Sequence, residues 1–437
     1  MSKQFIHSKL FNFIVYLKFW ELKLESKYSK KHMNTVRNRK IKKLIRSALK
    51  HELYQKKFKE AGLNPDMISN EEDLKLLPVL TKSEYRDMIN AALEDSENKK
   101  KYRYSHKDHT SGSTGIPLHT CLTPVEYATV VAQRLYLLNK NGYRLFRDSS
   151  MDMSSPVHKG TRRAKSLLQR FGLLKKYYVS TMDSPQTIIN AINESKPTEI
   201  TAGKSIMHSV LQYASDNNLD IYPVKFISNT AEPMDDSSAA LIEKFFGSDA
   251  LIDCYASIEA GIIANTMCGN RHKFHLNQSH YIYSIKSTDG ETADNGELFI
   301  TNLFLHQFPM INYKQGDYVE SIVDKSGTRY ITKVKGRNDD YILTKDGKQF
   351  SFHSLFAFLP KCSFIEQYRV IQEDYDNLRL LLVMRKSNKV DKNIVEKDFT
   401  EKLNLYLQGA EMTYHFEWID EIPIDKNGKI RVLISNL

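Results

Sequence analysis

Short apolar runs alternate with helical stretches between residues 143 and 260, and this alternation constrains the fold more than any other feature of the chain. The runs are KKYYVS, TEITAG, VKFISNT and ALIDCYA, and the helices expected between them cover 185–195, 205–217 and 235–246. Strand and helix alternating at this spacing predict a parallel, doubly wound sheet. Ligands bind such sheets at the carboxyl ends of the strands. The turns Asn229 to Pro233 and Ala256 to Glu259 are therefore expected to line one crevice.

A second feature is the loop from His109 to Pro117, HTSGSTGIP, which holds four hydroxyl side chains and two glycines. Hydroxyl donors, backbone N–H groups and glycines that let the main chain approach closely suit a polyanion such as a phosphate chain. The loop lacks the spacing and the lysine of the GxxxxGK[ST] P-loop, and Pro117 prevents a helix from starting in the usual P-loop way. A plain Ser/Gly-rich surface loop is the alternative.

The length of 437 residues suits two or three domains, and 41% hydrophobic with 26% charged residues is an ordinary globular composition. The four cysteines are too few and too scattered for a disulfide framework, which favours a reducing, cytoplasmic setting. They are Cys121, Cys254, Cys268 and Cys362.

The net charge of +11 is concentrated at the N-terminus. Residues 1–60 hold 17 Lys and Arg against 4 Asp and Glu, whereas the rest of the chain holds 46 against 48. The body of the protein is thus near neutral, and we expect no nucleic-acid partner.

The N-terminal segment FNFIVYLKFW, residues 11–20, has a helical apolar pattern formed by Leu10, Ile14, Leu17 and Trp20 or Glu21. Its apolar run before Lys18 is far shorter than the roughly 20 residues of a membrane span, and no small-residue cleavage site follows. Two alternatives remain open. The helix packs on the protein's own body and buries Phe13, Leu17 and Trp20, or residues 1–30 attach weakly to the anionic inner face of a membrane.

Further helices are expected along the chain before and after the loop. A basic helix is predicted over 34–60 and a short helix over 70–76, with a break at Asn64-Pro65 between them. Thr81 and Glu84 have the spacing of a capping box. A further apolar-periodic helix is predicted over 124–141.

The loop HTSGSTGIP resembles the phosphate loop S-G-[ST]-T-G-x-P of the adenylate-forming (acyl-CoA synthetase) superfamily. The leading histidine resembles the phenylacetate-CoA ligase and CapK (capsule-biosynthesis) branch in particular, and four later segments resemble the superfamily's motifs in the same order. The resemblance implies an α/β adenylate-forming enzyme fold, with a mostly parallel doubly wound sheet in a large N-terminal domain and a small mobile α+β C-terminal domain. The implied division is a helical region at 1–100, an AMP-binding core at 101–338 and the C-terminal domain at 339–437. The residues implied to hold phosphate are Thr110, Ser111, Gly112, Ser113, Thr114 and Gly115.

The two crevice turns resemble superfamily motifs. Asn229 to Pro233 is similar to the G-A-E-P turn, so Ala231 and Glu232 would frame the adenine. Residues 255–259 resemble Y-G-x-[ST]-E, in which Tyr255 would stack on the base and Glu259 would hold Mg²⁺. An aromatic ring suits stacking, and a carboxylate beside phosphates suits a hard cation.

That second turn departs from the pattern at two positions. Ala256 stands where the family has glycine, and it would still lie beside the nucleotide. Ile258 stands where the family has a hydroxyl residue, whose contact Ser257 would supply instead.

The ribose is implied to bind at Asn312 to Asp317, which resembles Y-x-x-G-D, with Asp317 accepting from both hydroxyls. A plain Gly-Asp hairpin turn is the alternative. Residues 335–342 resemble G-R-x-D-D-x-[IL], so Arg337 would lie near the ribose or phosphates and Asp339 would be the interdomain hinge.

The C-terminal region is expected to contain a helix over 391–408 and a strand over 412–419. Residues 422–431 then resemble P-x-x-x-x-G-K-I-x-R, which makes Lys429 the implied catalytic lysine between the substrate carboxylate and the α-phosphate. An Asn-Gly-Lys hairpin turn without catalytic function is the alternative.

A cluster of metal-ligating residue types suggests zinc as a further alternative: Cys254, Cys268, His272, His275 and His280. Their spacings fit no regular zinc ligand set. The resemblance places His275 toward the acyl pocket instead.

The function implied by the resemblance is ATP- and Mg²⁺-dependent adenylation of a small carboxylic acid, followed by transfer to CoA or to the phosphopantetheine of an acyl-carrier protein. A role in surface polysaccharide synthesis is part of that expectation. Two other classes stay open: a non-catalytic nucleotide-binding or membrane-associated accessory protein, and an acyl or adenylyl transferase of capsule assembly.

Overall fold

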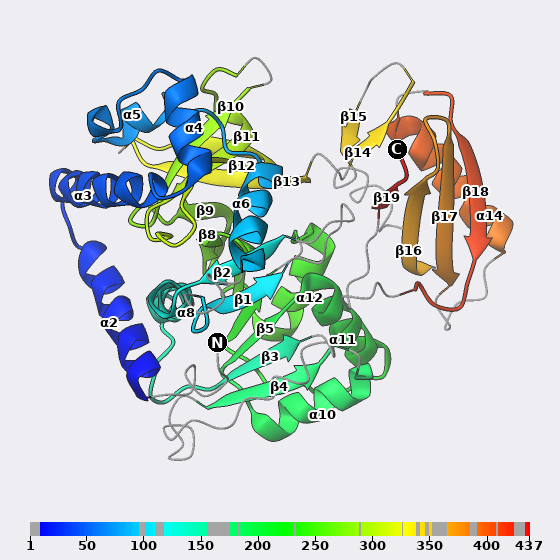
Figure 1. Ribbon diagram of the computed structural model, residues 1–437. Helices are drawn as coiled ribbons and strands as arrows, with labels where there is room; N and C mark the ends of the chain where they lie inside the picture. Colours follow the sequence, from blue (N-terminus) through cyan, green and yellow to red (C-terminus); the bar gives the residue numbers. More distant parts are fainter. Residues whose placement is uncertain are drawn as a thin grey trace.

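A computed structural model shows an α/β protein with a large sheet, N-terminal helices along one side of it and a separate smaller sheet at the C-terminus (Figure 1). It describes residues 9–95, 102–109, 118–154, 175–181, 183–230, 233–287, 290–325, 327–337, 341–345, 349–351, 365–384, 391–407, 410–423 and 433–437.

The N-terminal region is helical, as predicted, but the expected helix over 34–60 is two helices. The elements are α2 (Lys9–Glu25), α3 (Lys30–Ala48), α4 (Glu52–Glu60), η1 (Pro65–Met67), α5 (Glu71–Leu74) and α6 (Lys82–Glu94). The chain is extended at His51, whose Nε2 lies 3.0 Å from the carbonyl oxygen of Gln307. This tertiary contact ends the basic helix, and sequence periodicity does not reveal it. The capping box at the start of α6 is confirmed, since Thr81 N–H donates to Glu84 and Glu84 N–H donates to Thr81.

Helix α2 packs on α8 (Pro124–Lys140), but with a different face from the one expected. Phe11, Val15, Phe19 and Leu22 are buried against Ala128 and Ala132 of α8. Phe13, Leu17 and Trp20 are 58%, 51% and 41% exposed, so the prediction that docking buries these three side chains is wrong. Both faces of the helix are apolar, so the sequence alone does not show which one packs on α8.

The large sheet has eleven strands in the order β10-β11-β12-β13-β9-β8-β7-β6-β5-β3-β4. The half from β4 to β7 is parallel and agrees with the predicted doubly wound sheet. Its elements are β3 (Ser150–Ser154), β4 (Lys176–Ser180), α10 (Pro185–Ser195), β5 (Glu199–Ala202), α11 (Lys204–Asp216), β6 (Phe226–Asn229), α12 (Asp236–Phe246) and β7 (Leu251–Ser257).

Helices cover both faces of this parallel half. Ile227 and Leu251 pack with α10, α11 and α12 on one face. Their chain neighbours Phe226 and Ile252 point to the other face and pack with Leu137 and Leu138 of α8. The alternation follows from the two-residue period of a strand, and it confirms the α/β fold class.

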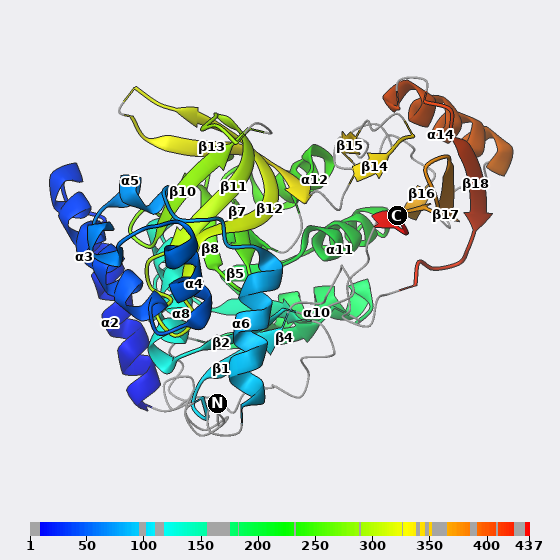
Figure 2. The same ribbon diagram turned by 45° about the horizontal axis from the view of Figure 1, so that its top comes forward.

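From β7 onward the sheet is antiparallel, a half that the sequence analysis did not describe (Figure 2). Its strands are β8 (Gly261–Met267), β9 (Asn270–Leu276), β10 (Tyr281–Lys286), β11 (Asn295–Asn302), β12 (Met310–Val323) and β13 (Arg329–Arg337). A separate hairpin of β1 (His106–His109) and β2 (His119–Leu122) lies on either side of the predicted phosphate loop.

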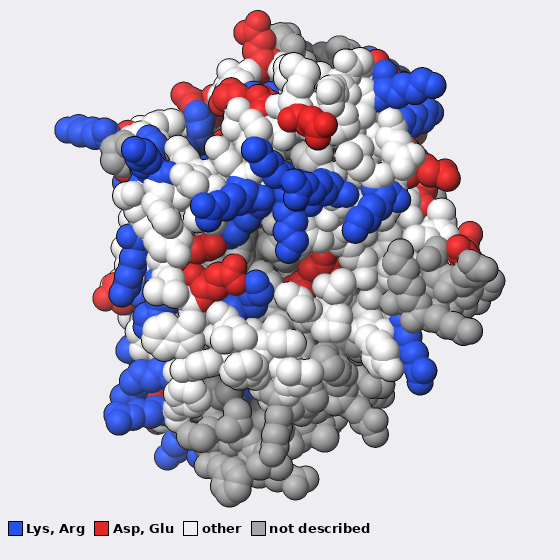
Figure 3. All heavy atoms as spheres, turned by 60° about the vertical axis from the view of Figure 1, so that its left-hand side comes forward, with Lys and Arg blue, Asp and Glu red and all other residues white. Residues whose placement is uncertain are grey.

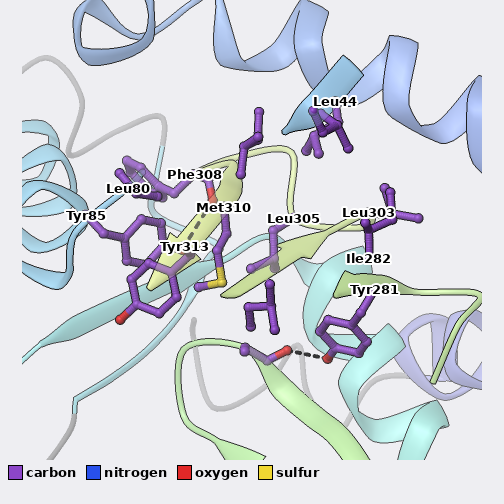
Figure 4. Close-up of a cluster of buried hydrophobic side chains, with 14 of the residues drawn as sticks. Leu44, Leu80, Tyr85, Tyr281, Ile282, Leu303, Leu305, Phe308, Met310 and Tyr313 are labelled. Carbon is purple, nitrogen blue, oxygen red and sulfur yellow. Dashed lines mark hydrogen bonds between the residues drawn. The ribbon is translucent and has the colours of Figure 1, made fainter. Parts of the chain in front are cut away.

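The antiparallel half shares one core with the N-terminal helices, and Figure 4 shows part of it. Tyr85 of α6 packs beside Tyr313 of β12, with ring centroids 5.6 Å apart, and its hydroxyl donates to the carbonyl oxygen of Phe308. Leu80 N–H donates to the carbonyl oxygen of Asn312, which ties the chain before α6 to β12. The N-terminal helices therefore support the strand that carries Asp317.

The C-terminal region forms its own sheet, in the order β18-β17-β16-β19, with its own core. The region begins with a separate hairpin of β14 (Tyr341–Leu343) and β15 (Gln349–Ser351). The other elements are β16 (Ile365–Gln372), β17 (Asn377–Met384), α14 (Lys392–Tyr406), β18 (Thr413–Trp418) and β19 (Leu433–Ser435). Phe399 and Leu403 of α14 pack against Val370 and Leu380. The helix and strand expected here are confirmed. Across the described parts of the chain, none of the helices has the length and apolar character needed to cross a bilayer.

Candidate functional site

The predicted nucleotide residues Tyr255 and Asp317 lie in direct contact, although 62 positions separate them in the chain. Tyr255 is near the end of β7, Asp317 is on β12, and the Tyr255 hydroxyl donates to Oδ2 of Asp317. Both side chains are at least partly buried. The fold thus joins the motif expected at the base with the motif expected at the ribose.

The backbone before Asp317 requires glycine. Gly316 has φ of +84°, and a Cβ on this residue would meet nothing within 4 Å, so the requirement is conformational and not one of space. Asp317 pairs across the ladder with Arg337, the last residue of β13. Strand pairing therefore brings the backbone of one further predicted residue, Arg337, next to Asp317.

Glu259 is a buried carboxylate at the turn after β7, only 3% exposed. Its Oε1 lies 3.4 Å from the Tyr313 hydroxyl, a long hydrogen bond. Its Oε2 is buried and has no hydrogen-bond partner among the residues that the structure describes. Burying a carboxylate oxygen without a partner is costly unless a cation or a ligand compensates. Glu259 therefore fits the expected Mg²⁺ ligand.

The turn that carries Glu259 is held by Ser257, whose Oγ accepts from the N–H of Ala260 at 3.2 Å. Ser257 was expected to replace the missing hydroxyl at Ile258, and its oxygen is engaged within the turn. Ile258 itself is 44% exposed. Ala256 pairs with Ile262 across a bulge between β7 and β8.

Asp253 is a residue of this region that the sequence analysis missed. It follows two buried residues of β7, and its Oδ1 accepts from Nδ2 of Asn229, at the end of β6, at 2.7 Å. Burial raises the pKa of Asp253 to about 6, although the hydrogen bond from Asn229 and the charge of Lys204 oppose the shift. A carboxylate inside the apolar run LIDCY was the available signal, because an ionisable residue is seldom buried in a strand unless it has a partner.

Most of the predicted phosphate, adenine, hinge and catalytic residues lie outside the described residues. They are Thr110, Ser111, Gly112, Ser113, Thr114, Gly115, Ala231, Glu232, Asp339 and Lys429.

The zinc alternative is not supported. Within the described segments, which include all five residues in question, no three His, Cys, Asp or Glu side chains are placed to hold one metal ion. His280 is buried with Nδ1 2.7 Å from Nε2 of Gln133, and His275 packs edge-on against Tyr330. Cys254 and Cys268 are free thiols whose pKa values burial raises.

A large cavity of about 1320 Å³ lies away from this site, between the N-terminal helices and α8. Lysines and carboxylates both line it, and none of the predicted site residues does. His306 is at its wall, where burial and the charges of Lys43, Lys18 and Lys50 lower its pKa to about 4.

The chain is similar in sequence to one protein family and to two characterised proteins. Residues 342–436 match the CapK C-terminal domain family. Protein CapK of Staphylococcus aureus is 23% identical over 403 residues, which cover 88% of this chain and 85% of that protein. Phenylacetate-coenzyme A ligase of Pseudomonas putida is 24% identical over 317 residues, which cover 69% of this chain and 70% of the ligase.

Among solved structures, 2-hydroxyisobutyryl-CoA ligase has the same fold. In the postadenylation state with 2-HIB-AMP it superposes with a TM-score of 0.75 and 16% identity, over 94% of this chain and 90% of the ligase. In the thioesterification state with 2-HIB-AMP and CoA the TM-score is 0.61, at 17% identity over 93% and 90%.

Proposed function

We propose that this chain, which has the fold of the adenylate-forming CoA ligases and the homologues CapK and phenylacetate-CoA ligase, activates a small carboxylic acid with ATP. The products of the first step would be an acyl adenylate and pyrophosphate. The observation that carries the proposal is the contact between Tyr255 and Asp317 beside the buried carboxylate of Glu259. One ring, one acceptor for the ribose and one oxygen ligand for a cation thus come from β7, the turn after it and β12.

Each described residue has a proposed task. Tyr255 stacks on the base, with Ala256 beside it, and orients the Asp317 carboxylate, which accepts from the two ribose hydroxyls. Glu259 supplies one oxygen to Mg²⁺. A site with one carboxylate is sufficient, because Mg²⁺ is commonly held by one or two carboxylates together with substrate phosphates and water. When bound, the cation would neutralise phosphate charge.

The remaining tasks fall to residues outside the described segments and to the side chain of Arg337. Thr110 to Gly115 would bind the leaving pyrophosphate, Ala231 and Glu232 would frame the adenine, and Arg337 would lie beside the ribose or phosphates. Lys429 would stabilise the negative charge that develops between carboxylate and α-phosphate.

The second half-reaction would transfer the acyl group to a thiol, of CoA or of a carrier protein. We propose that the region from 339 onward rotates about Asp339 between the two steps, which removes Lys429 from the site. The different TM-scores against two states of one ligase support this proposal, since the two superpositions cover nearly the same share of the chain.

Synthesis of a surface polysaccharide is the proposed biological setting, supported by the similarity to CapK. ATP and CoA as substrates are consistent with action in the cytoplasm. An acyl or adenylyl transferase of capsule assembly is the second candidate, and the same similarity favours it.

The deciding experiment measures pyrophosphate release from ATP and Mg²⁺ with a panel of aromatic, hydroxy and short-chain carboxylic acids. We expect release that depends on one class of acid, and a thioester when CoA is added. Tight ATP binding without pyrophosphate release for any acid would overturn the proposal and favour a nucleotide-binding accessory protein. Release that needs a sugar or carrier protein as acceptor would favour the transferase.

A further inference from the structure

Helix α2 carries a second apolar face that no part of the described chain covers. The outer stripe consists of Leu10, Phe13, Leu17, Trp20 and Leu24, each at least 41% exposed. Their spacing of three and four residues places them on one side of a helix. The inner face, with Phe11 and Leu22, is already buried against α8. The outer stripe is therefore not needed to hold the helix in place.

The exposed apolar surface extends beyond α2. Tyr16 is 41% exposed, and its ring centroid lies 6.5 Å from that of Phe146, which follows α8 in the chain and is 48% exposed. Contiguous exposed apolar surface of this kind marks an interaction site in a globular protein. Aromatic side chains are also the ones enriched at membrane–water interfaces.

Positive charge is concentrated in the segment that carries this surface. Residues 9–48 contain 12 Lys and Arg and only two acidic residues. Both of these are paired within the molecule, Glu21 with Lys18 and Glu25 with Lys40. Figure 3 shows a band of Lys and Arg side chains across this face at the level of α3. Lys23 lies beside the stripe, with Nζ 5.0 Å from the ring of Trp20.

We propose that the outer stripe of α2 docks in the interface of an anionic lipid bilayer, with the Lys and Arg side chains of α2 and α3 against the headgroups. The helix would lie in the plane of the membrane, as amphipathic helices with aromatic and basic side chains do. A second copy of this chain fits less well, because two such faces would bring their excess positive charges together. The proposal is independent of the chemistry at Asp317.

Substitutions on the outer stripe test this face without altering the packing face, whereas deletion of residues 1–30 would remove both. The variant Phe13→Glu/Leu17→Glu places two carboxylates on the outer stripe. Leu76→Glu is the matched control, since Leu76 is 60% exposed and lies outside the stripe. The full-length proteins are tested by co-sedimentation with phosphatidylcholine vesicles, with and without phosphatidylglycerol.

We expect the wild type and the control to bind only the anionic vesicles, and the double variant to bind at least about tenfold more weakly. Binding should fall when ionic strength rises from about 0.1 M to about 1 M, because the screening length shortens from about 10 Å to about 3 Å. Since the altered side chains are exposed, the variant should melt at the wild-type temperature.

Fluorescence gives a second readout, because the chain has only two tryptophans, Trp20 and Trp418. In Trp418→Phe, the emission of Trp20 should shift to the blue when anionic vesicles are added. The proposal is overturned if the wild-type protein does not bind anionic vesicles. It is also overturned if the double variant binds them as tightly as the wild type does. Self-association that the double variant abolishes, without vesicle binding, would assign the face to a second copy.

Discussion

The two halves of the large sheet are built differently, and the proposed nucleotide site lies where they meet. In the parallel half β4, β5 and β6 are each followed by a helix, so much of this half is built from short, local units. In the antiparallel half β13 pairs with β12 on one side and with β9, more than 50 residues away, on the other. β7 belongs to both halves, being parallel to β6 and antiparallel to β8.

The residues of the proposed site also come from both halves of the sheet. The parallel half ends in the polar pair Asn229 and Asp253, whereas the antiparallel half provides Asp317 and Tyr313. Tyr255 and Glu259 belong to β7 and the turn after it, and they contact Asp317 and Tyr313 respectively. The junction therefore brings the edge proposed to bind the base next to the strand proposed to bind the ribose. Substitutions on either side of the junction can test that division.

The largest effect should come from outside both halves. The described residues proposed to act in the site are Tyr255, Glu259 and Asp317, and none of them is positively charged. The positively charged side chain that stabilises the transition state is therefore expected to be Lys429. Lys429→Ala should lower adenylation by roughly 10² to 10³, about 3 to 4 kcal/mol, as for the loss of one electrostatic stabiliser. Thioester formation from supplied acyl adenylate should persist.

The control for this variant is Lys426→Ala, which removes the same charge three residues earlier in the same segment. Pyrophosphate release and thioester formation are measured separately for both variants. Equal losses in the two half-reactions, or an equal effect of the control, would show that Lys429 has no role specific to adenylation.

The sequence predicted the parallel half far better than the antiparallel half. The strands that end at Ser180, Asn229 and Ser257 were predicted, because a buried parallel strand has a continuous apolar sequence that is followed by a helical pattern. The antiparallel strands depend on long-range pairing, which local periodicity does not contain. Asp317 was reached only through its resemblance to a known motif.

Two other differences have causes that the local sequence does not contain. The helix predicted over 34–60 breaks because His51 contacts Gln307, a residue 256 positions away. The docked face of α2 was assigned wrongly because Phe11 and Phe13 are equally apolar in sequence, and α8 alone distinguishes them. Asp253 was missed because it interrupts an apolar run by one residue.

A second prediction concerns the edge of the parallel half. The pKa of Asp253 is about 6 in the folded protein, above the ordinary value of 3.8, so the folded state binds its proton more tightly than the unfolded state. This stabilising contribution is complete below about pH 4 and is lost as pH rises through 6. Asp253→Asn is neutral at every pH and keeps an oxygen to accept from Asn229.

We therefore expect Asp253→Asn to raise the free energy of unfolding by up to about 3 kcal/mol at pH 8, and by almost nothing at pH 4. Urea denaturation at the two pH values measures the difference. Asp87→Asn serves as control, because the Asp87 side chain is 68% exposed. A gain in stability that does not depend on pH would show that the Asp253 carboxyl does not titrate in this range.

A third prediction concerns the antiparallel half. Asp317→Asn keeps an acceptor but removes the charge, so ATP should bind more weakly by roughly 1.5 to 3 kcal/mol. Calorimetric titration with ATP measures this, with Asp324→Asn in the turn after β12 as control. Unchanged ATP affinity would make Asp317 a turn residue, and the Gly316-Asp317 segment a hairpin without a ligand.

The smallest effect tests the junction itself. Tyr255→Phe keeps the ring for stacking and removes only the hydroxyl that donates to Asp317. If that hydrogen bond orients the carboxylate toward the ribose, ATP affinity should fall by about 1 kcal/mol, the usual net value of one hydrogen bond. Tyr255→Leu should cost more, because it also removes the stacking surface.

Combining Tyr255→Phe with Asp317→Asn closes a double-mutant cycle across the two halves. When two side chains act through one shared contact, the combined loss is smaller than the sum of the single losses. We therefore expect the double variant to bind ATP about as weakly as Asp317→Asn alone. Losses that simply add would mean that β7 and β12 bind the nucleotide independently, and that their meeting at the junction is structural only.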